Sequence, residues 1–141
     1  MVLIEEGRAR VSKVRVLVVD DFEAWRRFVC STLQKNPELQ VIGEASDGLE
    51  AVHRAKELQP DLIVLDLGLP KLNGIEAARQ IRKLSPESKI LFLTQESSAD
   101  VVRAALDSGA QGYVLKARAG IDLLPAVKAV LENRQFVSSG L

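Results

Sequence analysis

Three aspartates and a lysine are the residues in this 141-residue sequence whose types and positions could do chemistry together. Asp20 and Asp21 directly follow one run of apolar residues, and Asp66 directly follows another. Lys116 comes after a third apolar run. Ligands of open α/β sheets bind at the carboxyl ends of the strands. If these runs are parallel strands, the four side chains are expected to meet in one crevice.

Carboxylates that lie within a few ångström repel one another, and a hard divalent cation keeps all of them ionised. Mg²⁺ suits a site with a few carboxylates, one backbone carbonyl and waters, and the carbonyl of Gly68 is the expected additional oxygen. A carboxylate oxygen of Asp66 would then attack phosphorus and form an acyl phosphate. Lys116 would add positive charge, and the hydroxyl of Thr94 would reach a phosphoryl oxygen.

Each of these residues also has an ordinary structural interpretation. Asp21 suits the N-cap of a first helix, and Thr94 suits the end of a strand. Lys116 taken alone reads as an exposed surface lysine, and Tyr113 as a packing residue. The functional interpretation therefore depends on the joint arrangement rather than on any single residue.

Apolar runs and helical spacing alternate along the chain, which predicts a parallel sheet with crossover helices. Gly109 is expected to end its helix in a left-handed conformation, and Pro125 is expected in the first turn of the last helix. The predicted strands are 14–19, 39–45, 62–65, 89–93 and 111–115, and the predicted helices are 25–33, 48–58, 73–84, 99–108 and 121–133.

The expected fold class is α/β, a doubly wound five-stranded parallel sheet, and the common strand order for such a sheet is 2-1-3-4-5. This order places the ends of the first and third strands side by side. The strand order reverses between these two strands, and the three aspartates follow their ends. The expected organisation is a leader at 1–13, one domain at 14–133, and a tail or the start of a linker at 134–141.

The amino-acid composition limits which binding partners and which cellular location are expected. Nineteen basic residues balance nineteen acidic ones, so no global charge predicts binding to nucleic acid or to an anionic membrane. The apolar runs are too short for a membrane span, and the first residues lack the pattern of a signal peptide. The single cysteine, Cys30, excludes an internal disulfide and suits a reducing compartment, so a cytoplasmic location is expected.

Taken together, these motifs resemble a response-regulator receiver domain of two-component signalling. The resemblance covers about 14–133. Residues 72–79 and 112–127 are similar to the NarL/FixJ type in particular. In that type, a LuxR-like DNA-binding domain follows the receiver. The matching residues are the pair Asp20-Asp21, Asp66 with Pro70 behind it, Thr94 after the fourth strand, and Gly112 to Lys116.

The resemblance implies a flavodoxin-like receiver fold and a phosphorylation-activated switch rather than a turnover enzyme. It implies that Asp66 accepts a phosphoryl group from a sensor histidine kinase, and that Mg²⁺ is held by Asp20, Asp21, Asp66 and the Gly68 carbonyl. Thr94 and Tyr113 would form the coupled switch pair, and Lys116 would bind the phosphoryl group. The output would be control of transcription, a homodimer is plausible, and the chain would be either an excised or a stand-alone receiver.

Three other functions remain open from the sequence. A haloacid-dehalogenase-type phosphatase also forms an aspartyl phosphate with Mg²⁺, but it usually has two aspartates spaced by one residue, whereas Asp20 and Asp21 are adjacent. A flavodoxin-like nucleotide binder would offer hydroxyls and amides to a phosphate, where this chain offers acids. A receiver that serves only as a protein-binding module is disfavoured by the intact set of acids, threonine and lysine.

Overall fold

The computed structural model describes residues 13–141, so the predicted leader lies outside the described residues except for Lys13. Strands and helices alternate along the described chain, as the sequence pattern predicts. The strands are β1 (Val14–Val19), β2 (Leu39–Ala45), β3 (Leu62–Leu65), β4 (Lys89–Thr94), β5 (Gly112–Leu115) and β6 (Phe136–Val137). The helices are α1 (Glu23–Leu33), α2 (Gly48–Leu58), α3 (Gly74–Leu84), α4 (Ala99–Asp107) and α5 (Ala119–Leu131), with a 3-10 turn η1 (Lys116–Arg118) before α5.

All neighbouring strands pair in parallel, and their order is β2-β1-β3-β4-β5-β6. The predicted order of the first five strands is therefore confirmed, and the α/β class with it. The prediction of only five strands is wrong, because residues of the expected tail form β6 along the edge of β5. This strand has two residues, too few for alternation of apolar and polar side chains to reveal it.

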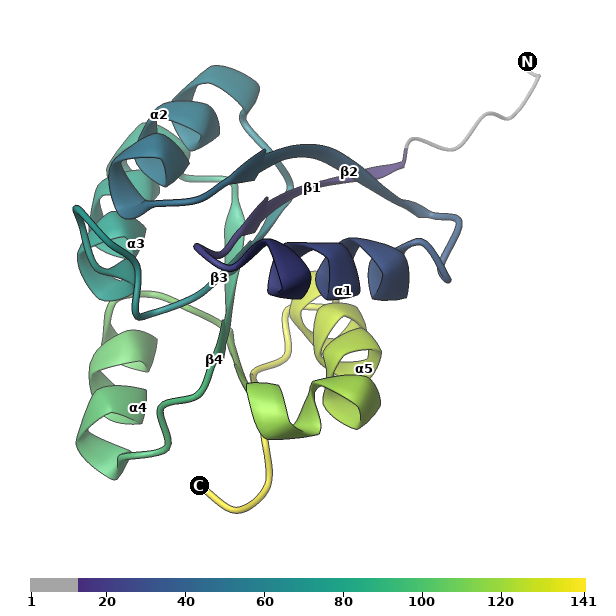
Figure 1. The fold of residues 1–141 in the computed structure, drawn as a ribbon, viewed down its shortest axis with the longest axis vertical. Helices are drawn as coiled ribbons and strands as arrows, with labels where there is room; N and C mark the ends of the chain where they lie inside the picture. The colour runs from purple at the N-terminus through teal and green to yellow at the C-terminus, as the bar shows by residue number, and fades with distance from the viewer. Residues whose placement is uncertain (1–12) are drawn as a thin grey trace.

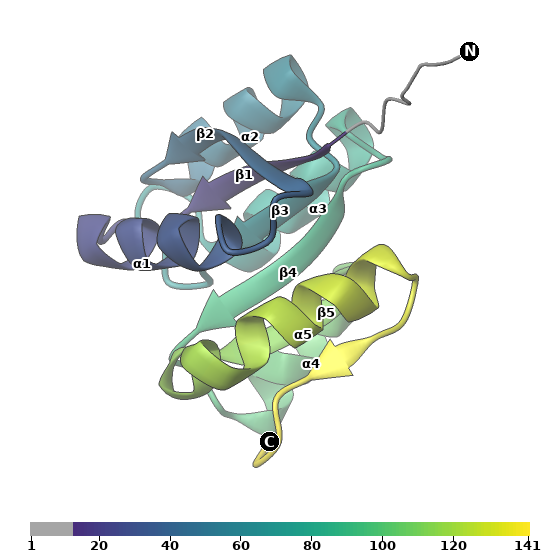
Figure 2. The same ribbon diagram turned by 90° about the vertical axis from the view of Figure 1, so that its right-hand side faces the viewer.

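Helices cover both faces of the sheet in two layers (Figure 1). α2, α3 and α4 lie on one face, while α1 and α5 lie on the other, as the turned view also shows (Figure 2). Short crossover connections between parallel strands produce this arrangement, since each helix must return the chain to the same end of the sheet.

β3 lies near the middle of the sheet, and both of its faces are buried. Ile63 and Leu65 belong to the apolar core on the α2–α4 side, while Leu62 and Val64 belong to the core on the α1–α5 side. Each of these four residues is at most 2% exposed. An uninterrupted apolar run is what such a strand requires, because neither face meets water.

Local capping signals start three of the helices. The side chains of Asp47, Asn73 and Ser98 accept hydrogen bonds from backbone N–H groups three residues later, at the starts of α2, α3 and α4. Gly109 follows α4 with φ of 105°, so the predicted left-handed residue at this helix end is confirmed.

The last helix begins two residues earlier than predicted, at Ala119, and Pro125 lies in its interior rather than in its first turn. The prediction used proline as a marker of a helix start. The helix tolerates Pro125 because the proline is exposed and the carbonyl it leaves unpaired belongs to Ile121, which is 69% exposed and can be hydrated.

Side chains anchor β6 to the rest of the domain. The Ser138 hydroxyl donates a 2.8 Å hydrogen bond to Asp122 of α5 and accepts one of 3.1 Å from the backbone N–H of Leu115. Asp122 also accepts a 2.9 Å hydrogen bond from Arg118. The C-terminal segment is thus tied to β5 and α5 together. Within residues 13–141, no helix has the length and apolar character needed to cross a membrane.

Candidate functional site

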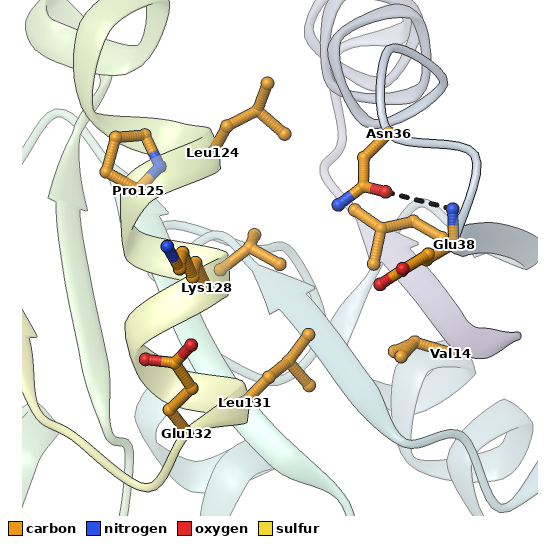
Figure 3. A pocket seen from close by; sticks show the side chains of 10 residues that line it. Val14, Asn36, Glu38, Leu124, Pro125, Lys128, Leu131 and Glu132 are labelled. Atoms are coloured by element: carbon orange, nitrogen blue, oxygen red, sulfur yellow. Dashed lines mark hydrogen bonds between the residues drawn. The ribbon is translucent and has the colours of Figure 1, made fainter.

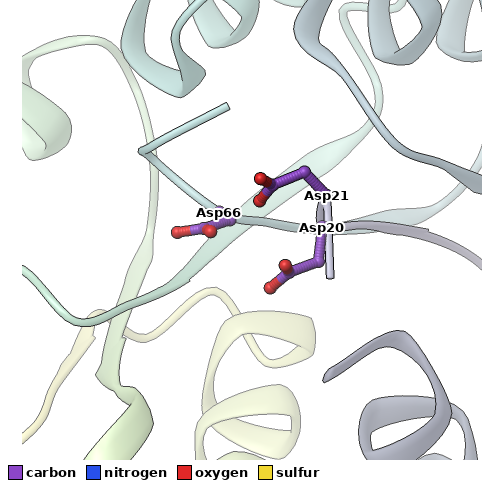
Figure 4. A group of neighbouring side chains, drawn as sticks. All are labelled: Asp20, Asp21 and Asp66. Atoms are coloured by element: carbon purple, nitrogen blue, oxygen red, sulfur yellow. The ribbon is translucent and has the colours of Figure 1, made fainter. Parts of the chain in front are cut away.

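Asp20 and Asp66 meet at the carboxyl end of the sheet because β1 and β3 are neighbours. The backbone N–H of Asp66 donates a 3.1 Å hydrogen bond to the carbonyl of Val19, so the strands stay paired up to the point where the acids begin. Asp20, Asp21 and Asp66 each offer a carboxylate oxygen, and these oxygens lie within 4.8 Å of one another. Figure 4 shows the three carboxylates pointing to the same side of the strand ends. Hard oxygen ligands at this spacing suit a divalent cation.

Asp21 does not cap the first helix. The N-cap residue of α1 is Phe22, and it makes no side-chain cap hydrogen bond, so the alternative that assigned this role to Asp21 is wrong. The side chain of Asp20 stabilises the turn instead, because its Oδ1 accepts a 2.9 Å hydrogen bond from the backbone N–H of Phe22. Asp21 itself is exposed beside the other two acids.

Lys116 lies across the acid pair rather than at the surface. Its Nζ is 2.8 Å from Oδ2 of Asp20 and 3.2 Å from Oδ2 of Asp66. The lysine side chain is only 4% exposed, and the same Nζ lies 4.9 Å from the centre of the Trp25 ring. The interpretation of Lys116 as an ordinary exposed lysine is therefore wrong, because its ammonium forms ion pairs with both acids.

Burial makes it costly for the clustered carboxyl groups to carry their negative charges. Loss of solvation raises the pKa of Asp20 above its usual value, and the neighbouring charge of Asp66 raises it further. Hydrogen bonds from Lys116 and from the backbone of Phe22 act in the opposite direction without cancelling the effect. A site of this kind favours a bound cation, and a bound cation would in turn attract a negatively charged phosphoryl group.

Thr94 and Tyr113 both contact the backbone of Glu96. The Oγ1 atom of Thr94, which ends β4, accepts a long hydrogen bond of 3.4 Å from the N–H of Glu96. The Tyr113 hydroxyl donates a 2.7 Å hydrogen bond to the carbonyl oxygen of Glu96. The tyrosine residue is fully buried, and this burial raises the pKa of its hydroxyl to about 12. Tyr113 therefore stays protonated and acts as a donor.

A pocket of about 370 Å³ opens beside Asp66. Its walls combine the acid and the lysine with the ends of β3 and β4, so an incoming group would meet both charges at once. The lining residues are Phe22, Asp66, Leu67, Gly68, Thr94, Gln95, Glu96 and Lys116.

A larger cavity of about 790 Å³ lies elsewhere, between α5 and the segments around β1 and β2 (Figure 3). Leu124 and Leu131 project into it from α5, and Val14 lines the opposite side. Val14 begins β1, whereas Asp20 follows its other end, so this cavity is remote from the acids. The larger of the two cavities is therefore not the candidate functional site.

Glycine allows the loop after Asp66 to pack closely. A Cβ atom on Gly74 would lie 2.2 Å from the carbonyl oxygen of Asp66 and 2.7 Å from Cα of Leu67, which are backbone atoms that cannot yield easily. Gly68 lies on the exposed part of this loop, and its N–H donates a long 3.4 Å hydrogen bond to Oδ1 of Asp66.

The structure thus brings the predicted Asp20, Asp21, Asp66 and Lys116 into one cluster. Thr94 and Gly68 line the adjoining pocket, whereas Tyr113 contacts the loop after β4 and does not line that pocket. No role is expected for Trp25 from the sequence, so its contact with Lys116 is one that sequence reasoning missed. No local signal points to this contact, because Trp25 and Lys116 lie far apart in the sequence.

The fold and the cluster together define a class of protein: an open parallel α/β domain with an acidic cation site and a lysine at its switch point. Comparison with known proteins makes the class specific. The model of the "Response regulator receiver domain" family matches residues 16–128. The chain belongs to this family, whose receiver domains are phosphorylation-activated signalling switches.

Individual relatives agree with this assignment. The chain is 40% identical over 126 residues to the transcriptional regulatory protein LiaR of Bacillus subtilis, with 89% of this chain and 60% of LiaR covered. It is 37% identical over 120 residues to the response regulator protein VraR of Staphylococcus saprophyticus, with 85% and 57% covered. The chain therefore spans less than two thirds of the length of these curated relatives.

A solved two-component response regulator of the LuxR family, from Aurantimonas sp. SI85-9A1, superposes with a TM-score of 0.86 at 34% identity. The match covers 91% of each chain. These comparisons bear out the NarL/FixJ-type resemblance that the sequence motifs suggested.

Proposed function

We propose that Asp66 is the phosphoacceptor of this receiver domain and takes its phosphoryl group from a phosphohistidine of a sensor histidine kinase. The observation that carries the proposal is the position of Lys116, whose buried ammonium bridges Asp66 and Asp20 beside the pocket. Asp66 is 7% exposed and lines this pocket, so the pocket is the natural route by which a phosphorus atom reaches its carboxylate.

The proposed transfer forms one bond and breaks one. A carboxylate oxygen of Asp66 attacks phosphorus, and the bond from phosphorus to the donor imidazole breaks with its electron pair staying on nitrogen. The product is an acyl phosphate on Asp66. Lys116 faces the oxygens of the transferring group with positive charge, and the hydroxyl of Thr94 donates to one of them.

Asp20, Asp21 and Asp66 are the residues that would hold Mg²⁺, with the carbonyl of Gly68 as a further oxygen. When bound, Mg²⁺ supplies positive charge that offsets the negative charge of the transferring group. Two observations support the fit: the carboxylate oxygens lie within 4.8 Å of one another, and burial raises the pKa of Asp20 in a way that a cation would reverse.

We further propose that Thr94 and Tyr113 form the switch. Phosphorylation adds about two negative charges at Asp66, which attract the Thr94 hydroxyl. This hydroxyl would exchange its long hydrogen bond from Glu96 for one to the phosphoryl group, and Tyr113 would move with the loop. The surface formed by α4, β5 and α5 would change, and partners that prefer the new surface would shift the population toward it.

The wider role is also a proposal. LiaR carries the name of a transcriptional regulatory protein, which supports an output in transcription for the protein to which this receiver contributes. We infer one receiver domain from 14–133, extended by β6, which forms a homodimer and turns over no external substrate. A cytoplasmic location agrees with the single cysteine, Cys30.

Acetyl phosphate with Mg²⁺, followed by intact-mass measurement and peptide mapping, tests the acceptor. One added phosphoryl group on the peptide that contains Asp66 is expected, and the Asp66→Asn variant should gain none. A phosphoryl group that persists unchanged in Asp66→Asn would reject the assignment. Steady turnover of many small phosphate esters would instead support a phosphatase.

A further inference from the structure

Trp25 is the one aromatic residue whose ring lies against the ammonium of Lys116 in the described chain. The Nζ atom is 4.9 Å from the ring centroid, within the range of a cation–π contact. Trp25 is half-buried and packs against the apolar core, with the ring of Phe28 edge-on at a centroid distance of 5.4 Å and an interplanar angle of 81°. The ring is therefore held in place by its neighbours while its face meets the lysine.

We propose that Trp25 is a positioning residue that keeps the Lys116 ammonium at the phosphoryl-binding site. Lys116 has three partners: the carboxylates of Asp20 and Asp66, and the ring of Trp25. The two carboxylates are also the expected cation ligands, so their hold on Lys116 weakens when their charge is shared. The face of an uncharged ring is not subject to this competition.

The contact is stronger here than it would be on an open surface. The side chain of Lys116 is 4% exposed, and a desolvated ammonium interacts more strongly with an aromatic face than a hydrated one. Trp gives the strongest such contact among the aromatic residues, Phe a weaker one, and an aliphatic side chain none. A role limited to packing would depend on the volume of residue 25, whereas the proposed role depends on its ring.

The inference about Trp25 rests on the proposed phosphorylation of Asp66. It is tested by the rates at which acetyl phosphate phosphorylates the protein and its variants at saturating Mg²⁺. Trp25→Leu should slow the reaction by roughly tenfold, and Trp25→Phe should recover part of the loss. Phe136→Leu is the matched control, since it removes an aromatic ring that packs on the same apolar core but lies beside Gly112, at the end of β5 away from Lys116, and its rate should match that of the unchanged protein. Equal rates for Trp25→Leu and the unchanged protein would overturn the proposal, as would equal losses in Trp25→Leu and Phe136→Leu.

A second measurement needs no phosphoryl transfer. Trp25 is the single tryptophan of the chain, so tryptophan fluorescence reports on the surroundings of this one ring, which include the ammonium of Lys116. Lys116→Met should shift the emission of Trp25, whereas Lys116→Arg, which keeps a cation over the ring, should shift it less. An emission spectrum that is the same in Lys116→Met and the unchanged protein would overturn the contact. If the unchanged protein gains no phosphoryl group at all, the proposed function fails while this measurement still judges the role of Trp25.

Discussion

The hydroxyl of Tyr113 donates a 2.7 Å hydrogen bond to the carbonyl oxygen of Glu96, and this bond connects β5 to the loop that leaves Thr94. The tyrosine ring is tilted by 53° to the ring of Phe92, with the centroids 6.3 Å apart. The fully buried tyrosine therefore restrains an exposed loop at the edge of the candidate site.

Tyr113→Phe should loosen this loop with little change to the core. Loss of one hydrogen bond to a carbonyl that water can reach should lower the free energy of unfolding by about 1 kcal/mol. Backbone amides from Glu96 to Val101 should exchange hydrogen faster, which exchange measured by mass spectrometry would detect. Unchanged exchange in this segment would show that the tyrosine does not restrain it.

Mg²⁺ should raise the melting temperature of the unchanged protein. A ligand at 100 times its Kd stabilises the folded state by about 2.7 kcal/mol, and the carboxylates of Asp20, Asp21 and Asp66 form the expected site. Asp20→Asn should lose most of this increase, whereas Asp107→Asn, at the exposed C-terminal end of α4, should retain it. Thermal unfolding with Mg²⁺ and with EDTA makes the comparison, and an equal Mg²⁺ response in Asp20→Asn would reject the site.

Without metal, Asp20 should make stability depend on pH. Its folded pKa is raised, chiefly by burial, above the ordinary value of 3.8. A carboxyl of this kind contributes its stability below the unfolded pKa and loses it as the pH rises through the folded pKa. The unfolding free energy of the unchanged protein relative to Asp20→Asn should therefore fall from about pH 4 upward. Denaturant unfolding in EDTA would measure it, and a difference that rises with pH would contradict the assignment.

Ser138→Ala should release the C-terminal strand. The substitution removes one hydrogen bond to Asp122 and one from Leu115, and it leaves a buried carboxylate with fewer donors. We expect a loss of about 1–3 kcal/mol, together with faster hydrogen exchange at Tyr113 to Leu115. The exposed Ser139→Ala serves as the control and should leave both quantities unchanged. Slow exchange in Ser138→Ala would mean that backbone pairing alone holds β6.

Gly74→Ala should displace the backbone at Asp66. Its Cβ would fall 2.2 Å from the carbonyl oxygen of Asp66, so the chain must shift, with a loss of about 1–3 kcal/mol and weaker Mg²⁺ binding. Gly120→Ala is the matched control, because nothing lies within 4 Å of its Cβ and alanine favours the helix by about 0.5–1 kcal/mol. Calorimetry and Mg²⁺ titration of both variants would test the pair, and equal stability in the two would contradict the steric argument.

Local features of the sequence determined most of the fold. Apolar runs located β1 to β5, and Gly109 located the end of α4, because strand burial and helix capping depend on residues close together in the chain. The acids at the ends of the first and third runs also indicated where the site would lie, once the common strand order was assumed.

Tertiary structure alone decided the contacts that give the site its properties. The burial of Lys116 between Asp20 and Asp66, the ring of Trp25 over its ammonium, and the anchoring of β6 through Ser138 join segments far apart in the sequence. Lys116 and Asp66, for example, are 50 residues apart. Whether such side chains meet depends on how the strands align and how the helices pack on them. No single stretch of sequence encodes that alignment, since it is set by the burial of the whole apolar core at once.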